Sequence, residues 1–152
     1  MVGLSRSVPL CLGLTLIVAG AAHADKVQPE DLRPDSSRLV IELNAAEDRA
    51  GACRLTFVAE NQLGADLSVL GLEAVVFSAV GQVARLTLLD FQALPQGRKR
   101  VRQFDLPGLP CAGVGQVLIN AASPCTGQGV DPAACMAGLR VSSRVQGLEI
   151  AG

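Results

Sequence analysis

The stretch Cys53-Arg-Leu-Thr-Phe-Val-Ala-Glu60 decides the fold, because it is the cleanest alternation of side-chain types in the chain. The apolar side of the alternation consists of Cys53, Leu55, Phe57 and Ala59. The other side carries Arg54, Thr56, Val58 and Glu60. Successive side chains of a strand point to opposite faces, so this period of two predicts a strand with one face buried and one face half-exposed.

Short apolar runs with similar spacing flank this stretch on both sides and are separated by turn residues. We expect strands over 38–43, 70–80, 83–91, 98–106, 114–122 and 139–150, with Gly81-Gln82 forming a hairpin turn that needs a positive φ. About seven short strands at this spacing predict an all-β fold, a single disulfide-containing β-sandwich over 38–152.

One segment also fits a helix. Apolar residues fall at helical spacing at Leu63, Leu67, Leu70, Ala74 and Phe77. Against a helix stand Gly71 and four valines between 69 and 80, since β-branched residues favour strands. We favour a strand over 70–80 and allow a short helical turn around 65–69.

Residues 1–24 are predicted to be a signal peptide that is cleaved after Ala24. Arg6 supplies the positive n-region, an uncharged apolar run follows from Val8 to Ala22, and Ala22-His23-Ala24 is a small-x-small cleavage site. We expect a flexible polar segment over 25–37 at the start of the mature chain. The dominance of Ala, Gly, Leu and Val over lysine is typical of a GC-rich bacterial genome, so the predicted compartment is the periplasm.

Cleavage would leave four cysteines, and an even number in an oxidising compartment predicts two disulfides. Three connectivities are possible. We favour Cys53–Cys111 with Cys125–Cys135, which would join two distant segments and close one short loop. The sequence has no CxxC motif, and its cysteines lack zinc-site spacing, so we expect no redox pair, no metal site and no cofactor.

Composition excludes several function classes. The one histidine, His23, lies in the predicted signal, and the chain has no Trp or Tyr, so a His-dependent triad cannot exist in the mature protein. Without Arg6, 12 basic residues face 14 acidic ones, which argues against a nucleic-acid partner. Paired carboxylates are the remaining catalytic device, and the candidates on expected strands are Glu42, Glu60, Glu73, Asp90 and Asp105.

The only local charge anomaly is a basic cluster made of Arg98, Lys99, Arg100 and Arg102. On an edge strand, Arg98, Arg100 and Arg102 would share one face at intervals of about 6–7 Å, with Lys99 and Val101 on the other. Such a row suits an acidic envelope protein or an anionic polymer as partner. The alternative is that these cations guard an exposed sheet edge against aggregation.

Part of the chain resembles known modules. The pattern runs from Asn61 through Leu70-Gly-Leu-Glu-Ala-Val-Val-Phe-Ser-Ala-Val-Gly-Gln-Val83, then Leu94-Pro-Gln-Gly97 and Arg102-Gln-Phe-Asp-Leu106. It resembles immunoglobulin-like modules of bacterial envelope proteins, of which the FxLYD type is one. From CRLTFVAEN to RVRQFDLPGLPC the chain is also similar to small exported proteins of alphaproteobacteria that often carry a Tat-signal label. Neither resemblance implies an active site.

Together these observations predict an exported, non-catalytic binding or assembly module of the bacterial envelope. Two alternatives remain open. One is a small envelope hydrolase that uses two of the carboxylates named above. The other is a structural accessory subunit of a larger envelope complex.

Overall fold

The alternating stretch forms the strand β2 (Ala52–Gln62) in the computed structural model, which describes residues 37–152. Cys53, Leu55, Phe57 and Ala59 are fully buried, and the residues between them are half-buried. The predicted strand is therefore confirmed with its predicted buried face. The predictions for residues 1–24 and for 25–36 lie outside the described residues.

β2 lies inside a four-stranded sheet, sheet A, in the order β5-β2-β1-β7. Its antiparallel neighbours are β1 (Arg38–Arg49) and β5 (Lys99–Pro107). The short strand β7 (Leu139–Ser143) pairs in parallel with β1, and Leu39 lies opposite Leu139. The edge strands of sheet A are thus β5 and β7.

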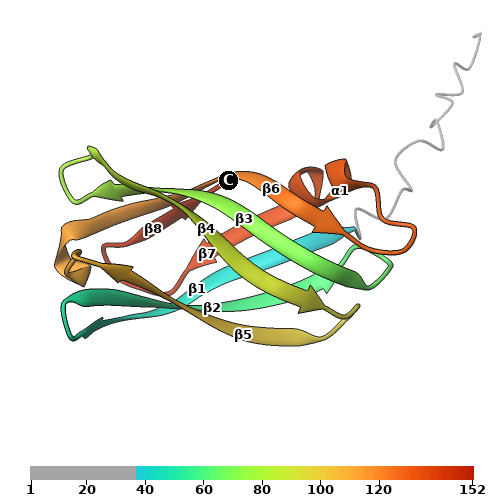
Figure 1. Cartoon of the computed structure of the whole chain (residues 1–152), viewed down its shortest axis with the longest axis horizontal. Coiled ribbons are helices and arrows are strands. Elements are labelled where there is room, and N and C mark those ends of the chain that lie inside the picture. Colours follow the sequence, from blue (N-terminus) through green and yellow to red (C-terminus); the bar gives the residue numbers. More distant parts are fainter. Residues whose placement is uncertain (1–36) are drawn as a thin grey trace, which may run out of the picture. The chain divides into compact units, whose positions relative to one another are not determined.

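The second sheet, sheet B, has the order β4-β3-β6-β8 and packs against sheet A (Figure 1). It consists of β3 (Leu67–Ser78), β4 (Val83–Leu94), β6 (Val114–Thr126) and β8 (Glu149–Ala151). β3 pairs antiparallel with β4 and β6, whereas the three-residue strand β8 pairs in parallel with β6. The predicted all-β sandwich is confirmed.

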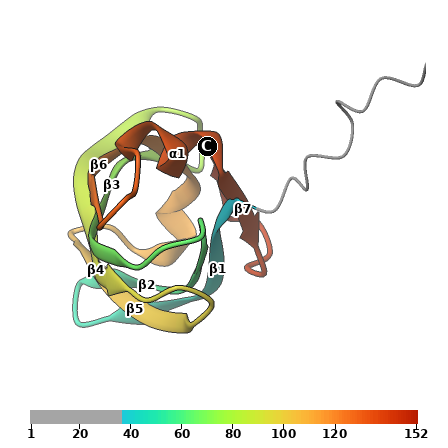
Figure 2. The same ribbon diagram turned by 90° about the vertical axis from the view of Figure 1, so that its right-hand side faces the viewer.

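The core lies between the inner faces of the two sheets, and phenylalanines fill one part of it. The rings of Phe57, Phe91 and Phe104 lie with centroids 5.2–5.9 Å apart in edge-on or tilted arrangements. Such geometries suit the ring quadrupole. Because these residues come from β2, β4 and β5, the cluster joins the two sheets where the edge strands β4 and β5 lie side by side (Figure 2).

The last segment differs from its prediction. The expected single strand over 139–150 is two strands, β7 and β8, which belong to different sheets. Between them the chain turns: the Ser143 hydroxyl donates to the Leu148 carbonyl over 2.7 Å, and the Arg144 backbone amide donates to the Leu43 carbonyl over 2.8 Å. The described residues therefore form eight strands rather than about seven.

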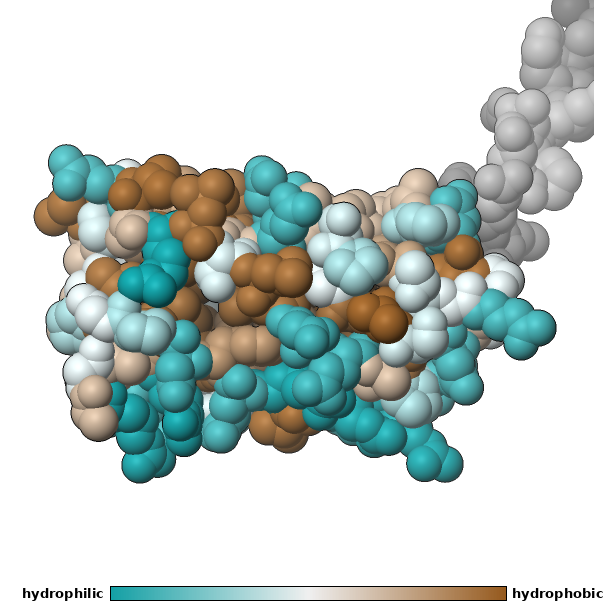
Figure 3. All heavy atoms as spheres, in the orientation of Figure 1, coloured by the Kyte–Doolittle hydropathy of each residue, from teal (hydrophilic) through white to brown (hydrophobic). Residues whose placement is uncertain are grey.

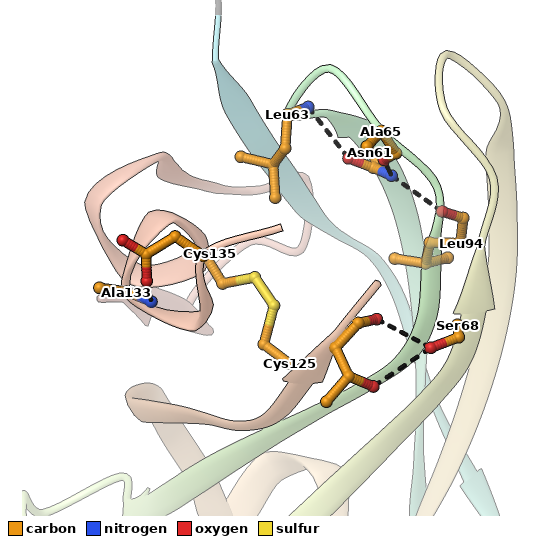
Figure 4. The surroundings of a disulfide bond; sticks show 10 residues. Asn61, Leu63, Ala65, Ser68, Leu94, Cys125, Ala133 and Cys135 are labelled. Carbon is orange, nitrogen blue, oxygen red and sulfur yellow. Dashed lines mark hydrogen bonds between the residues drawn. A yellow bond between two sulfur atoms is a disulfide. The ribbon is translucent and has the colours of Figure 1, made fainter. Parts of the chain in front are cut away.

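The segment with two interpretations is a strand, as favoured, and β3 begins at Leu67. The helical turn around 65–69 was wrong, because Asn61 holds the preceding loop in another shape. Its fully buried side chain donates to the carbonyls of Ala65 (2.8 Å) and Leu94 (2.9 Å) and accepts from the Leu63 amide (3.0 Å) (Figure 4). The hairpin turn is confirmed, with Gly81 at φ 79°.

Both favoured cysteine pairs form disulfides. Cys53 on β2 bonds to Cys111, which lies in a 3-10 turn, η2 (Cys111–Gly113), rather than on a strand. Cys125 on β6 bonds to Cys135 in the one short helix of the described residues, α1 (Pro132–Ala137), which the sequence analysis did not anticipate (Figure 4). The Asp131 carboxylate caps this helix by accepting from the Ala133 amide.

Candidate functional site

The basic cluster lies at and just before β5, which is an edge strand as the docking hypothesis required. Arg98 precedes the strand and is exposed, so the expected row of three arginines along one strand face is only two long. The half-buried Arg100 and Arg102 share the inner side of β5 with Phe104 and Leu106. The outer side presents Lys99, Val101 and Gln103 to solvent.

Arg102 points across the gap between the two sheets. Its Nε donates to the Phe91 carbonyl of β4 over 2.9 Å. In the reverse direction, the Arg85 guanidinium of β4 donates to the Pro107 carbonyl of β5. Two arginines thus satisfy backbone carbonyls on neighbouring edge strands, which ties sheet A to sheet B and covers acceptors that a foreign strand would otherwise use.

The outer face of sheet A is covered by ion pairs. Arg54 donates two hydrogen bonds to the Asp105 carboxylate, from Nε to Oδ1 at 2.7 Å and from Nη2 to Oδ2 at 2.9 Å. The Arg54 hydrogen bond holds the pKa of Asp105 below its usual range. Glu42 lies on the neighbouring strand β1, and its carboxylate is 2.8 Å from the guanidinium of Arg144, which follows β7. The Arg144 hydrogen bond lowers the pKa of the Glu42 carboxyl. Several charges on this face are therefore paired with one another.

The five candidate catalytic carboxylates are divided between the two sheets. Glu42, Glu60 and Asp105 lie on sheet A, and each has its own cation, which for Glu60 is Lys99 at 3.8 Å. Glu73 and Asp90 are diagonal neighbours on the outer face of sheet B, where Glu73 lies opposite Leu88 and Asp90 opposite Gly71. A general acid needs a raised pKa, whereas the pKa values of Glu42 and Asp105 are lowered. Glu42 and Asp105 therefore do not suit the role of general acid in the hydrolase alternative.

The outer face of sheet B has the opposite character. A row of apolar side chains crosses its strands in direct register, where Val75 of β3 lies between Leu86 of β4 and Leu118 of β6. Leu86 is 74% exposed and Leu88, one step along the same side of β4, is 52% exposed. We call these four residues, with the adjacent Glu73 and Asp90, the sheet B face.

The hydropathy of the surface follows this division. Apolar atoms gather over β3 and β4, and hydrophilic side chains line the margin where β5 lies (Figure 3). A hollow of about 310 Å³ opens on the sheet B face, with Glu73, Val75 and Leu88 among its lining residues. Apolar surface left in water is costly, and contiguous exposed apolar patches are often interaction sites.

Charge is segregated in the same way. The described residues include ten Lys and Arg, and nine of them belong to sheet A, its edge or its connecting loops. The exception, Arg85, bonds to the Pro107 carbonyl. The sheet B face therefore carries two carboxylates, Glu73 and Asp90, and no cation. Glu73 lies directly opposite Leu88 in the register of β3 and β4, so this charge is set among aliphatic side chains.

A larger cleft of about 890 Å³ opens between η2 and the loop that joins β7 to β8. Its walls are mostly Ala, Val, Gly and Leu. Of its polar side chains, the Ser143 hydroxyl is already committed to the Leu148 carbonyl, and Glu149 lies at the rim beside Gln116. Polar groups do not converge in this cleft as they do in most small-molecule sites.

Within residues 37–152, no cluster of three His, Cys, Asp or Glu side chains could hold a metal ion. In the same range, no helix is long and apolar enough to cross a membrane. Comparisons of the chain with protein-family models, curated proteins and solved structures find no match.

The basic cluster was predicted from the sequence as a docking site, and the sheet B face was not. A signal for that face was present: β4 carries leucines at 86, 88 and 89, so apolar residues fall on both of its sides. In an antiparallel sheet with one solvated face, apolar residues normally alternate with polar ones along each strand. β4 departs from this pattern, because Leu86 and Leu88 place apolar side chains on its outer side.

Proposed function

We propose that this chain is an exported, non-catalytic binding or assembly module that contacts its partner through the sheet B face. The observation that carries the proposal is the contrast between the two outer faces. Three ion pairs cover the outer face of sheet A, whereas sheet B has the exposed Leu86 and Leu88 and the half-buried Val75 and Leu118 beside two carboxylates without a cation in residues 37–152.

The size of the sheet B face limits the strength of the contact. Its residues lie on three strands about 4.8 Å apart and span four residue rises of about 3.4 Å, which gives an area of roughly 200 Å². A standard stable interface buries about 800 Å² on each partner, so the contact proposed here is of the weak or transient kind.

The two disulfides fit an oxidising, exported environment. We propose the periplasm as the compartment, on the basis of the predicted signal over residues 1–24. An immunoglobulin-like module is the corresponding proposal for the type of sandwich, and the mostly antiparallel pairing within both sheets supports it.

Site-specific photo-crosslinking in the cells that export the protein tests the proposal. A photoreactive amino acid replaces Leu86 on the sheet B face, and a matched variant carries it at Ser142 of β7 on the outer face of sheet A. Both positions are exposed on edge strands. We expect a crosslinked product from position 86 and none from position 142. Equal products from both positions, or none from position 86, would refute the proposal.

The basic cluster remains a second docking hypothesis for an acidic envelope protein or an anionic polymer. Arg98 supports it, since this exposed guanidinium makes no ion pair within residues 37–152. Arg102 does not, because its Nε is bonded to the Phe91 carbonyl. A crosslinker at Arg98 that captures an acidic partner while position 86 captures nothing would favour this hypothesis over the sheet B face.

A further inference from the structure

We infer that the partner of the sheet B face is a second copy of this chain, which docks head to tail through the corner where β5 begins. The inference rests on the proposed function, because it uses the same face. The corner consists of Arg98, Lys99 and Val101, and we call it the basic corner. One copy would therefore present its basic corner to the sheet B face of the next.

Charge decides between the two ways in which identical chains can pair. In a two-fold symmetric contact, the sheet B face would meet itself, and Glu73 and Asp90 of each copy would lie in one apolar interface without a cation. Like charges brought together in an interface are strongly unfavourable. A symmetric face-to-face dimer is therefore disfavoured, although its apolar residues would match.

The basic corner has the complementary chemistry. Val101 is an exposed apolar side chain, 58% accessible, on the outer side of β5. Lys99 lies two residues before it on the same side, and its side chain is 71% exposed despite the 3.8 Å contact with Glu60. Arg98 adds a second cation without an ion pair in the described part of the chain.

The spacing of the two surfaces also matches. Lys99 and Val101 stand two residues apart on one strand face, about 6.6–6.8 Å. On the sheet B face, Glu73 and Val75 have the same spacing, as do Asp90 and Leu88. When the two surfaces dock, Lys99 can therefore face a carboxylate while Val101 contacts the aliphatic side chain beside that carboxylate. The hollow next to Glu73 can receive the Val101 side chain.

The symmetry of this contact determines which oligomers it forms. The two surfaces lie on different sheets of the same molecule, so the contact is heterologous, and each added copy leaves one basic corner and one sheet B face free. The contact therefore produces oligomers that grow with concentration. With a patch of roughly 200 Å², well below about 800 Å² on each partner, we expect a dissociation constant between about 1 μM and about 1 mM.

A charge-swap experiment tests the inference on the purified exported protein. The first variant carries Glu73→Arg with Asp90→Arg, and the second carries Arg98→Glu with Lys99→Glu. Sedimentation equilibrium measures mass up to about 1 mM protein, in about 20 mM and about 500 mM salt, where screening differs strongly. Interference optics are required, because the chain contains no Trp or Tyr. Circular dichroism checks that both variants are folded.

We expect the wild type to associate in low salt and to dissociate in high salt. Each variant alone should be monomeric, since its two surfaces carry the same charge. An equimolar mixture should associate again, because each surface then finds its opposite on the other variant. A merely sticky or unfolded variant would not show this recovery on mixing.

Two results would overturn the inference: a wild type that stays monomeric in low salt at about 1 mM, or a mixture that fails to recover association. The crosslinking experiment separates these results from a failure of the proposed function. If position 86 captures a different polypeptide while the wild type is monomeric, the docking face stands and the second copy is wrong. If association persists in a Leu86→Ser, Leu88→Ser variant, the sheet B face itself is wrong.

Discussion

Replacing Arg102 with methionine should destabilise the fold although the residue lies at the surface edge of the sandwich. The Arg102 Nε donates to the Phe91 carbonyl over 2.9 Å, and this bond links β5 of sheet A to β4 of sheet B. Methionine keeps an unbranched apolar stem of similar reach but cannot donate a hydrogen bond. The Phe91 carbonyl would lose the guanidinium that now satisfies it.

A hydrogen bond that involves a charged group contributes about 1.5–3 kcal/mol to stability. The Arg102 side chain is only half-buried, so water can replace part of the interaction, and we expect a loss of about 1–2 kcal/mol in the free energy of unfolding. For a domain of this size, 1 kcal/mol corresponds to about 4 °C in Tm, which gives a decrease of about 4–8 °C. Arg98→Met is the matched control and should change stability by less than about 0.5 kcal/mol.

The assay is urea unfolding with the disulfides intact, followed by far-UV circular dichroism, since the chain has no Trp or Tyr for fluorescence. Equal losses for Arg102→Met and Arg98→Met, or a loss below about 0.5 kcal/mol for Arg102→Met, would refute the role assigned to this hydrogen bond.

Further predictions concern the Arg54–Asp105 ion pair, the close packing at Gly127 and the two disulfides. Because Arg54 lowers the pKa of Asp105 in the folded state, the stabilisation from Asp105 is present above its unfolded pKa of about 4 and is lost as pH falls through the lower folded value. Urea unfolding at two pH values should therefore show a deficit of Asp105→Asn at pH 7 that shrinks at a pH of about 2.5. A Cβ at Gly127 would lie 2.2 Å from the Asp66 carbonyl oxygen, so Gly127→Ala should cost about 1–3 kcal/mol, whereas Gly113→Ala, with its nearest atom at 3.5 Å, should cost little in the same assay. Alkylation of the oxidised protein should label no thiol in residues 37–152, and the loops of 58 and 10 residues predict losses of about 4 and about 3 kcal/mol when each disulfide is removed.

Strands could be predicted from the sequence where one of their faces is buried and the other is exposed to solvent. Alternation at Cys53–Glu60 predicted both the strand β2 and its buried side. In β5 the alternation predicted which residues share a side, but the side with Arg100 and Arg102, expected to dock a partner, is the inner one. The disulfide pairs followed from loop lengths, although the site of Cys111 in a 3-10 turn did not. Local patterns therefore identified most elements.

Features that depend on tertiary pairing could not be predicted in the same way. Residues 139–150 carry apolar side chains on both sides of a turn, and only their partners, β1 and β6, divide them between two sheets. The sheet B face was hidden because Leu86 and Leu88 look like core residues until the neighbouring sheet is known. Arg102 looked like a surface cation, and its partner is a backbone carbonyl that carries no sequence signal.

The helix α1 has local sequence signals at both of its ends. Asp131 is a favoured N-cap residue, Pro132 occupies the first helical position, and Gly138 follows the last turn. Six residues are too few to show an apolar period, which is why only the capping residues could have revealed it.

The parallel pairs at the end of the chain have a consequence for folding kinetics. Leu39 and Leu139 are direct neighbours in β1 and β7, and one hundred residues separate them in sequence. Contacts of such long range require costly loop closure before they can stabilise anything, so the hairpins β1–β2 and β3–β4 should form first and closure of this margin should come last. Until the segment from Leu139 onward is in place, β1 and β6 each lack a neighbour. During that interval their bare edges are open to wrong partners, and the time that a folding chain spends before closure sets its exposure to aggregation.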